Sequence, residues 1–258
     1  MILYYKGCTA SEKIPEIADA TEYILKKAGI KYHTLENEPC CGSVLLRTGF
    51  HDAAIQQMKE NINFLKDYQN ETILTSCAGC YKTLKNDYKE KLNTEFNVIH
   101  ISQLLNQLIK EGKISPEKND IKVTYHDPCH LCRHAGESEA PREVIKSSAD
   151  LVEMKHNRED ALCCGSGGGV KSAYNDMSNE IAKNRMKEAE ESGAELLVTA
   201  CPFCKLNLND NSDMEVLDLS EFICTNLKKQ EEEEKETITK VTGMYKEWFL
   251  DYASYVIL

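Results

Sequence analysis

The chain has 258 residues, of which 41% are hydrophobic and 28% charged, and its formal net charge at pH 7 is −11. This composition suits a globular protein with one or two apolar cores, and it excludes collagen, low-complexity polymers and wholesale disorder. So acidic a surface repels phosphate backbones and anionic lipids, which disfavours binding to nucleic acid or to a membrane surface. The sequence shows no run of about 18 apolar residues for membrane insertion and no signal-peptide pattern at its start. We therefore expect a cytoplasmic protein with reduced thiols.

Short apolar runs alternate with helical patterns along the first 110 residues. Their order predicts a strand over 2–5, helices over 14–28 and 52–66, a strand over 72–75, and helices over 81–92 and 101–109. Pro15 near the start and Gly29 just after the end delimit the first of these helices. A polar linker follows over residues 112–120.

The second part of the chain repeats this alternation. A strand is predicted over 121–125, a long helix after Tyr174, and a strand over 195–199. Alternating strands and helices predict an α/β fold with mostly parallel sheets. We expect two duplicated, Rossmann-like domains over 1–115 and 120–228, related by a pseudo-twofold axis. An acidic linker and a helix-like tail would follow over 229–258.

The cysteines carry the clearest evidence for duplication. Ten of the twelve form the pattern C-x31-CC-x35-C-x2-C and then C-x33-CC-x36-C-x2-C, with matched cysteines 121 to 124 residues apart. A repeat of this length is the size of a domain rather than of a solenoid unit. In both copies the first cysteine and the C-x2-C pair come just after a predicted strand, at the edge where open α/β sheets bind ligands.

Five thiols at one edge are one more than a tetrahedral zinc ion takes. Adjacent cysteines fit poorly on one metal ion but readily on neighbouring irons of a cluster, since consecutive Cα atoms are about 3.8 Å apart. Three alternatives stay open from the residues alone: a structural zinc in one copy, disulfides, and a phosphate site at the glycine-rich run over 165–169. That run lacks the G-x-G-x-x-G order and does not follow a clean strand.

The double pattern resembles the cysteine-rich CCG domain family, and in particular the heterodisulfide reductase branch (the B subunit, or the C-terminal half of the D subunit). The resemblance covers residues 1 to about 228. It rests on the motifs GCTAS at 7–11, CCGS at 40–43, SCAGCY at 76–81, HDPCHL at 126–131 and CGSGGGV at 164–170. The larger D-type proteins carry a ferredoxin-like part ahead of these repeats. None precedes them here, so we expect a separate electron donor.

The resemblance implies two noncubane 4Fe-4S clusters. One would be held by Cys8, Cys40, Cys41, Cys77 and Cys80, and the other by Cys129, Cys163, Cys164, Cys201 and Cys204. It implies an oxidoreductase subunit that reduces a disulfide, by analogy the anionic coenzyme M–coenzyme B heterodisulfide of methanogenesis. The implied donor is a ferredoxin-like subunit with two cubane clusters, with a flavin or hydrogenase module further upstream. The alternatives are an electron-transfer subunit of a hydroxy-acid oxidase or a thiol-dependent fumarate reductase, and a structural zinc protein.

Basic residues beside the second copy suggest where an anionic substrate would bind. His126 and Arg133 are candidate catalytic, substrate-lining residues, and His130 and Lys171 are further basic candidates near the second cluster. The alternative for His126 is a hydrogen bond to backbone at the strand end. Cys132, where the family is expected to carry glycine, is interpreted as a spare thiol, with a ligand swap with Cys129 as the minor alternative. Cys224 lies on an apolar helical stripe and is predicted to be a core residue.

Overall fold

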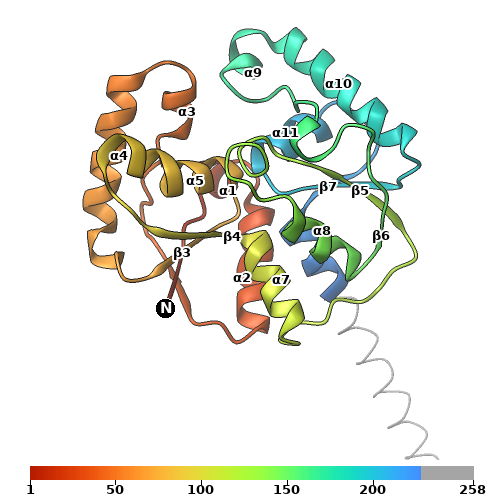
Figure 1. Cartoon of the computed structure of the whole chain (residues 1–258), viewed down its shortest axis with the longest axis horizontal. Helices are drawn as coiled ribbons and strands as arrows, with labels where there is room; N and C mark the ends of the chain where they lie inside the picture. The colour runs from red at the N-terminus through yellow and green to blue at the C-terminus, as the bar shows by residue number, and fades with distance from the viewer. Residues whose placement is uncertain (228–258) are drawn as a thin grey trace, which may run out of the picture.

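Two four-stranded parallel sheets frame the molecule in the computed structural model, which describes residues 1–227 (Figure 1). The first sheet has the order β2-β1-β3-β4 and the second β6-β5-β7-β8, and every pair is parallel. The strands of the first are β1 (Ile2–Tyr4), β2 (Tyr32–Thr34), β3 (Thr72–Thr75) and β4 (Asn97–His100); those of the second are β5 (Lys122–His126), β6 (Asp150–Leu151), β7 (Leu196–Thr199) and β8 (Val216–Asp218). The predicted α/β fold of two similar parallel units is confirmed.

The helices follow the predicted order closely. The first half contains α1 (Cys8–Glu12), α2 (Pro15–Lys27), α3 (Ser43–Arg47), α4 (His51–Leu65), η1 (Lys66–Tyr68), α5 (Ala78–Lys82), a π-helical turn η2 (Thr83–Asp87), α6 (Tyr88–Leu92) and α7 (Ile101–Lys110). The second half contains α8 (Glu139–Lys146), η3 (Arg158–Asp160), α9 (Val170–Ala173), α10 (Asn175–Glu191) and α11 (Pro202–Asn209), and residues 219–227 are also helical. The helix predicted over 81–92 begins earlier, at Ala78, and contains the π turn.

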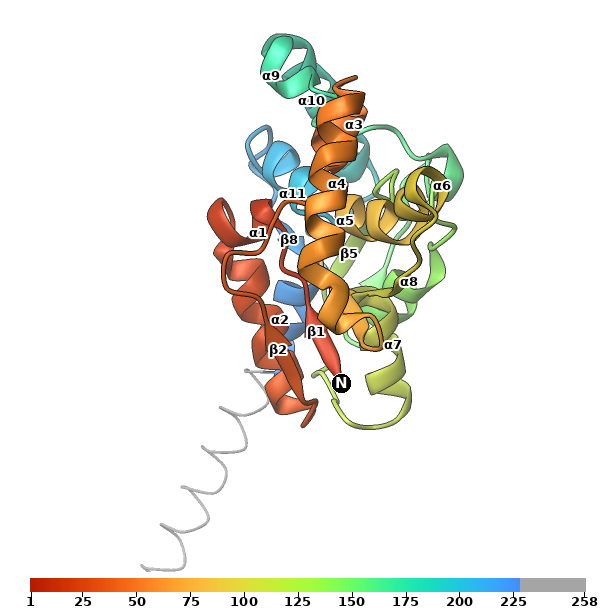
Figure 2. The same ribbon diagram turned by 90° about the vertical axis from the view of Figure 1, so that its left-hand side faces the viewer.

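A layer of helices joins the two sheets. In Figure 1, α2, α7 and α8 lie in the middle of the molecule, whereas α4 and α10 lie on its outer flanks; Figure 2 looks onto α4. Helix α7 packs against α8, and the Thr21 hydroxyl of α2 bonds Ser220 Oγ at 3.2 Å. Buried side chains of both halves form one continuous hydrophobic core. The boundaries proposed at 115 and 120 therefore separate two sheets that share a core, and they stay a prediction.

The carboxyl ends of the central strands of both sheets face the same region. Strand β1 begins at the labelled N-terminus in Figure 1 and runs toward α1, and β3 and β7 lead into α5 and α11. Loops at this edge are free to carry binding residues on a rigid support. None of the helices within residues 1–227 combines the length and apolarity needed to cross a membrane. The predicted tail over 229–258 lies outside the described residues.

Candidate metal centre

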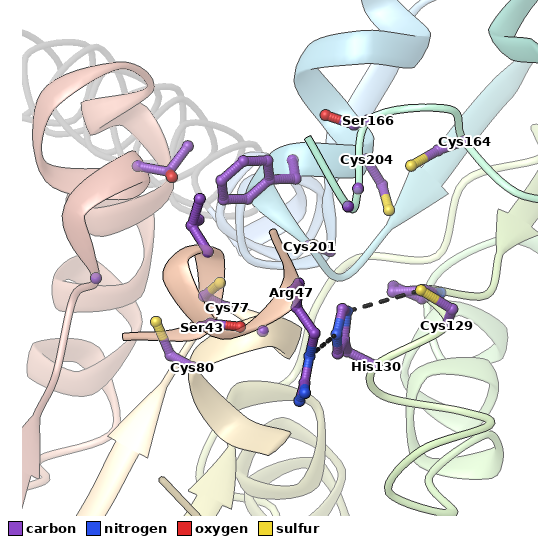
Figure 3. Close-up of a pocket in the computed structure, with 18 of the residues that line it drawn as sticks. Ser43, Arg47, Cys77, Cys80, Cys129, His130, Cys164, Ser166, Cys201 and Cys204 are labelled. Carbon is purple, nitrogen blue, oxygen red and sulfur yellow. Dashed lines mark hydrogen bonds between the residues drawn. The ribbon is translucent and has the colours of Figure 1, made fainter. Parts of the chain in front are cut away.

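One cavity collects all ten cysteines of the repeated pattern. Its empty volume, including the open mouth, is about 980 Å³, and its walls come from both halves of the chain. Figure 3 shows Cys77 and Cys80 of the first half lying across from Cys129, Cys164 and Cys204 of the second. Among the ten, Cys8 and Cys163 are exposed, and six others are buried. The cavity is therefore deep at the C-x2-C pairs and open to solvent at these two exposed thiols.

The same local structure presents the C-x2-C pairs in the two halves. Cys77 and Cys201 cap the N-termini of α5 and α11, directly after β3 and β7, with extended backbones at φ −105° and −157°. Cys80 and Cys204 follow three residues later, on the first turn of each helix. Because residues three apart lie on one face of a helix, each pair points its thiols the same way.

Glycine shapes the backbone after each pair of adjacent cysteines. Gly42 and Gly165 have φ of 85° and 82°, a conformation that side chains with a Cβ disfavour. Their backbone N–H groups donate to the sulfurs of Cys40 at 3.5 Å and Cys163 at 3.3 Å. Both halves thus turn a backbone N–H onto the first thiol of the pair, as is common for sulfur atoms that bind metals.

Substituting Gly165 by alanine is expected to destabilise the second half of the centre. A Cβ here would lie 2.5 Å from the Ser178 carbonyl oxygen, a clash added to the cost of positive φ. We expect the free energy of unfolding in urea to fall by about 2–5 kcal/mol. Gly193→Ala is the matched control, since Gly193 has a φ of 75° but nothing within 4 Å of an added Cβ. It should cost only about 1–2 kcal/mol; equal losses in the two variants would contradict a packing role for Gly165.

Close contacts between thiols split their pKa values in opposite directions. Hydrogen bonds from Cys40 and Cys80 hold the pKa of Cys41 well below its ordinary value, and those from Cys163 and Cys204 do the same for Cys164. Hydrogen bonding to Cys41 and to Cys77 raises the pKa of Cys80 well above it. Each half therefore repeats one arrangement of a stabilised thiolate beside a thiol that resists ionisation.

This donor set fits a polynuclear metal centre. Neighbouring thiols that cannot all ionise together gain the most from a multiply charged cation, which lets every one of them bind as thiolate. Cys77 of the first half and Cys201 of the second also hydrogen-bond, which raises the pKa of Cys77. Hydrogen bonds from Cys204 and from Cys77 lower the pKa of Cys201. The two groups of five thus meet inside the cavity, and soft thiolates of this number suit iron–sulfur clusters or zinc.

Of the four predicted basic residues, His130 lines the cavity and the other three do not. His126 is buried, and one of its ring nitrogens lies within 4.8 Å of the sulfurs of Cys164 and Cys204. Its Nδ1 accepts a hydrogen bond from Arg185 Nε at 3.1 Å. The Arg133 guanidinium donates to the Ala161 carbonyl oxygen, and Lys171 pairs with Asp210. Neither His126, Arg133 nor Lys171 is among the residues that line the cavity.

Sequence reasoning missed an arginine that lines the cavity next to His130. Arg47 on α3 belongs to the first half, and its Nε donates to His130 Nε2 of the second half at 3.2 Å (Figure 3). Arg47 also pairs with the buried carboxylate of Asp87, which Lys82 contacts as well. The His130 ring stacks on His134, with centroids 5.3 Å apart. Because Arg47, Asp87 and His130 are far apart in sequence, no local pattern could have indicated their grouping.

The two remaining cysteines lie away from the cavity. Cys132 is buried beside a separate polar hollow that includes Asn157 and Arg158, and burial raises its pKa to about 11. Its interpretation as a spare thiol beside the cluster stays a prediction. Cys224 is buried in the hydrophobic core, as predicted.

Comparisons with known proteins agree with this geometry. The sequence profile of the cysteine-rich domain family (CCG) matches residues 2–85 and 123–209, once in each half. The chain is 44% identical over 221 residues to the D subunit of the dihydromethanophenazine:CoB–CoM heterodisulfide reductase of Methanosarcina acetivorans, covering 82% of this chain and 54% of that one. It is 35% identical to the B subunit of the CoM/CoB fumarate reductase of Methanothermobacter marburgensis, covering 83% and 42%. The chain thus spans about half the length of the curated relatives it matches.

Similarity to solved structures is confined to the fold. The aspartate racemase of Picrophilus torridus aligns over 89% of this chain and 93% of its own, with 12% identity and a TM-score of 0.40. At that distance the likeness carries no information about activity.

Proposed function

Because the chain belongs to the cysteine-rich domain family, and because its ten repeated cysteines line one open cavity, we propose that it is an iron–sulfur oxidoreductase subunit that reduces a disulfide. That gathering of two sets of five thiols is the observation that carries the proposal. Cys8, Cys40, Cys41, Cys77 and Cys80 would hold one noncubane 4Fe-4S cluster, and Cys129, Cys163, Cys164, Cys201 and Cys204 the other. The clusters would supply electrons one at a time.

Disulfide reduction suits a paired centre. One disulfide, two electrons and two protons give two thiols, so two one-electron carriers around one cavity match the stoichiometry. The exposed positions of Cys8 and Cys163 support access for a substrate from solvent. Arg47 and His130 also line the cavity and supply a positive charge and hydrogen-bond donors on a chain of net charge −11. This local basic surface favours an anionic disulfide.

The relatives indicate which disulfide and which partner to test first. Their names refer to the CoB–CoM heterodisulfide, which makes that compound the first candidate substrate. Because these relatives are named as subunits of a larger reductase, a partner that supplies electrons is part of the proposal. The proposed donor is a ferredoxin-like protein with two cubane clusters, with a flavin or hydrogenase module upstream, in the cytoplasm.

The direct test uses anaerobically prepared protein, a reduced viologen as donor, and the CoB–CoM heterodisulfide. We expect two viologen radicals to be oxidised and two thiols to appear for each disulfide consumed. Full iron loading without thiol formation would overturn the disulfide reductase and favour the electron-transfer role in a fumarate reductase or hydroxy-acid oxidase. Stoichiometric zinc with little iron would overturn both.

Arg47→Gln is expected to weaken substrate binding. Removing a guanidinium from the cavity wall should raise KM for an anionic disulfide about tenfold, with a smaller change in kcat, since it removes binding energy. Steady-state kinetics at matched iron content measures this. Lys59→Gln on the neighbouring α4 is the control, because it makes the same change of charge at an exposed position away from the cavity. An unchanged KM in both variants would remove Arg47 from the substrate site.

A further inference from the structure

Each half of the chain places one polar side chain beside the second cysteine of its CC pair, and the two side chains differ. In the second half it is His126, close to Cys164 and Cys204. In the first half it is Tyr5, which is buried, and burial together with the nearby Cys41 and Cys80 raises the pKa of its hydroxyl. These positions are 121 residues apart, as are the first cysteines of the two copies. His126 and Tyr5 are therefore structural counterparts.

The residues that support these side chains also differ, and one of them is charged. Arg185 on α10 donates through Nε to His126 Nδ1 at 3.1 Å. Its counterpart 124 residues earlier is Asn61 on α4, which donates to the Tyr88 hydroxyl at 2.8 Å and to the Tyr5 hydroxyl at 3.4 Å. Arg185 and Asn61 are both fully buried. The second half thus has a buried cation where the first half has a neutral amide.

Arg185 determines which nitrogen of His126 carries a proton. A guanidinium N–H can only donate, so Nδ1 must accept, and the proton of the neutral imidazole lies on Nε2. With Nδ1 occupied by Arg185, this Nε2–H is the group that remains to donate to the sulfurs of Cys164 and Cys204, which lie within 4.8 Å of a His126 ring nitrogen. His126 is therefore a donor to a ligand sulfur rather than a metal ligand itself.

Tyr5 has no such effect in the first half. Its hydroxyl donates to the carbonyl oxygen of Pro39, so its proton is not available to the sulfurs of Cys41 and Cys80. A further histidine of the second half is arranged in the same way as His126. His130 Nε2 accepts a hydrogen bond from Arg47, so its Nδ1 carries the proton, and Nδ1 lies 3.7 Å from the Cys129 sulfur. Two arginine–histidine pairs thus act on the second group of cysteines. Thr9, beside the matching Cys8, is neutral.

Hydrogen bonds and positive charge near ligand sulfurs stabilise the more negative, reduced state of a cluster and raise its reduction potential. Glu188 bonds Arg185 Nη1 at 2.7 Å and offsets part of the charge, but it does not contact the Nε that faces His126. Arg185 Nη2 is buried and has no hydrogen-bond partner among residues 1–227. A buried cation with an unused donor is what a neighbouring anionic cluster would stabilise.

We propose that Arg185, acting through His126, raises the reduction potential of the second-half cluster above that of the first-half cluster. The first electron to reach the protein would then rest in the second half. Arg185 is a positioning residue in this scheme, since it touches neither substrate nor cluster ligand. The inference rests on the proposed function only in requiring two iron–sulfur clusters, and not on the identity of the disulfide.

The test measures each potential separately by redox titration monitored by electron paramagnetic resonance. Cys41→Ser keeps only the second cluster, and Cys164→Ser only the first. We expect the reduction potential of the second cluster to exceed that of the first by at least about 59 mV. For a one-electron couple, this difference is a tenfold change in the ratio of reduced to oxidised cluster at a fixed potential. Arg185→Gln combined with Glu188→Gln, and separately His126→Phe, should each lower the second potential by a similar amount and leave the first unchanged.

Controls separate tuning from general damage. Lys183→Gln removes the same charge from an exposed site on α10, with 58% of the side chain accessible, and should move neither potential. If the double variant fails to fold, Arg185→Lys is used instead, because it keeps the ion pair with Glu188 but lacks the planar Nε donor. It should shift the potential by an intermediate amount. The inference would be wrong if the two single-cluster proteins had equal reduction potentials, or if the variants kept their potentials at full iron content. Either result would leave the proposed function standing. Failure of the unmodified protein to bind two clusters would instead overturn the proposed function.

Discussion

Cys41→Ser is expected to halve the iron content of the protein. Two clusters of about four irons each give about eight per chain, and loss of one cluster leaves about four. The Cys41 thiol hydrogen-bonds with both Cys40 and Cys80, so replacing it removes a ligand from the middle of the first group of cysteines. Cys164→Ser should have the same effect on the second group, where Cys164 contacts Cys163 and Cys204. Iron and acid-labile sulfide analysis of protein prepared without oxygen measures both.

Cys132→Ser is the matched control for these variants. Cys132 is a buried thiol in the same half as Cys164 but lies outside the cavity wall, so its replacement should leave all of the iron bound. Loss of a cluster from this variant would instead support a ligand swap with Cys129. Loss of all iron from either Cys41→Ser or Cys164→Ser would show that the two groups do not load independently.

Asp127→Ala is expected to lower the free energy of unfolding by about 3–5 kcal/mol. The Asp127 carboxylate accepts hydrogen bonds from Arg142 Nη1 at 2.7 Å and Nη2 at 2.8 Å, and also from the backbone N–H of Arg158 at 2.8 Å. The side chains of Asp127 and Arg142 are both 0% exposed. Removing the carboxylate would leave a buried guanidinium with only the partly exposed Glu153 as its charged partner. Urea unfolding measures the change.

Glu143→Ala is the control for this ion pair. Glu143 pairs with Lys146 on the same helix, where both side chains are about half exposed, so its loss should change stability by less than about 0.5 kcal/mol. A loss of similar size in the two variants would mean that the buried pair is held no more strongly than a surface one. Because Asp127 lies two residues before Cys129, iron content should be measured alongside, to separate loss of fold from loss of metal.

Much of the fold follows from local patterns. The apolar runs before Cys77 and Cys201 predicted β3 and β7. The spacing of apolar residues predicted both ends of α2 and α4 to within one residue. These patterns are readable because a strand or helix must bury the face that its period creates. The repeated cysteine spacing likewise indicated two similar units before any contact was known. Because the cysteines are spaced alike in both halves, they are expected at equivalent strand ends.

The sequence by itself therefore determined the α/β class, the duplication and the ten cysteines, since each is written in order along the chain. The tertiary structure decided how the halves meet: one shared core, one cavity for both groups of thiols, and Arg47 reaching across to His130. It also placed His126 close to Cys164 and Cys204 but off the cavity wall, and hydrogen-bonded to Arg185. Partners 59 and 83 residues apart are chosen by packing between elements, and no local period records that choice.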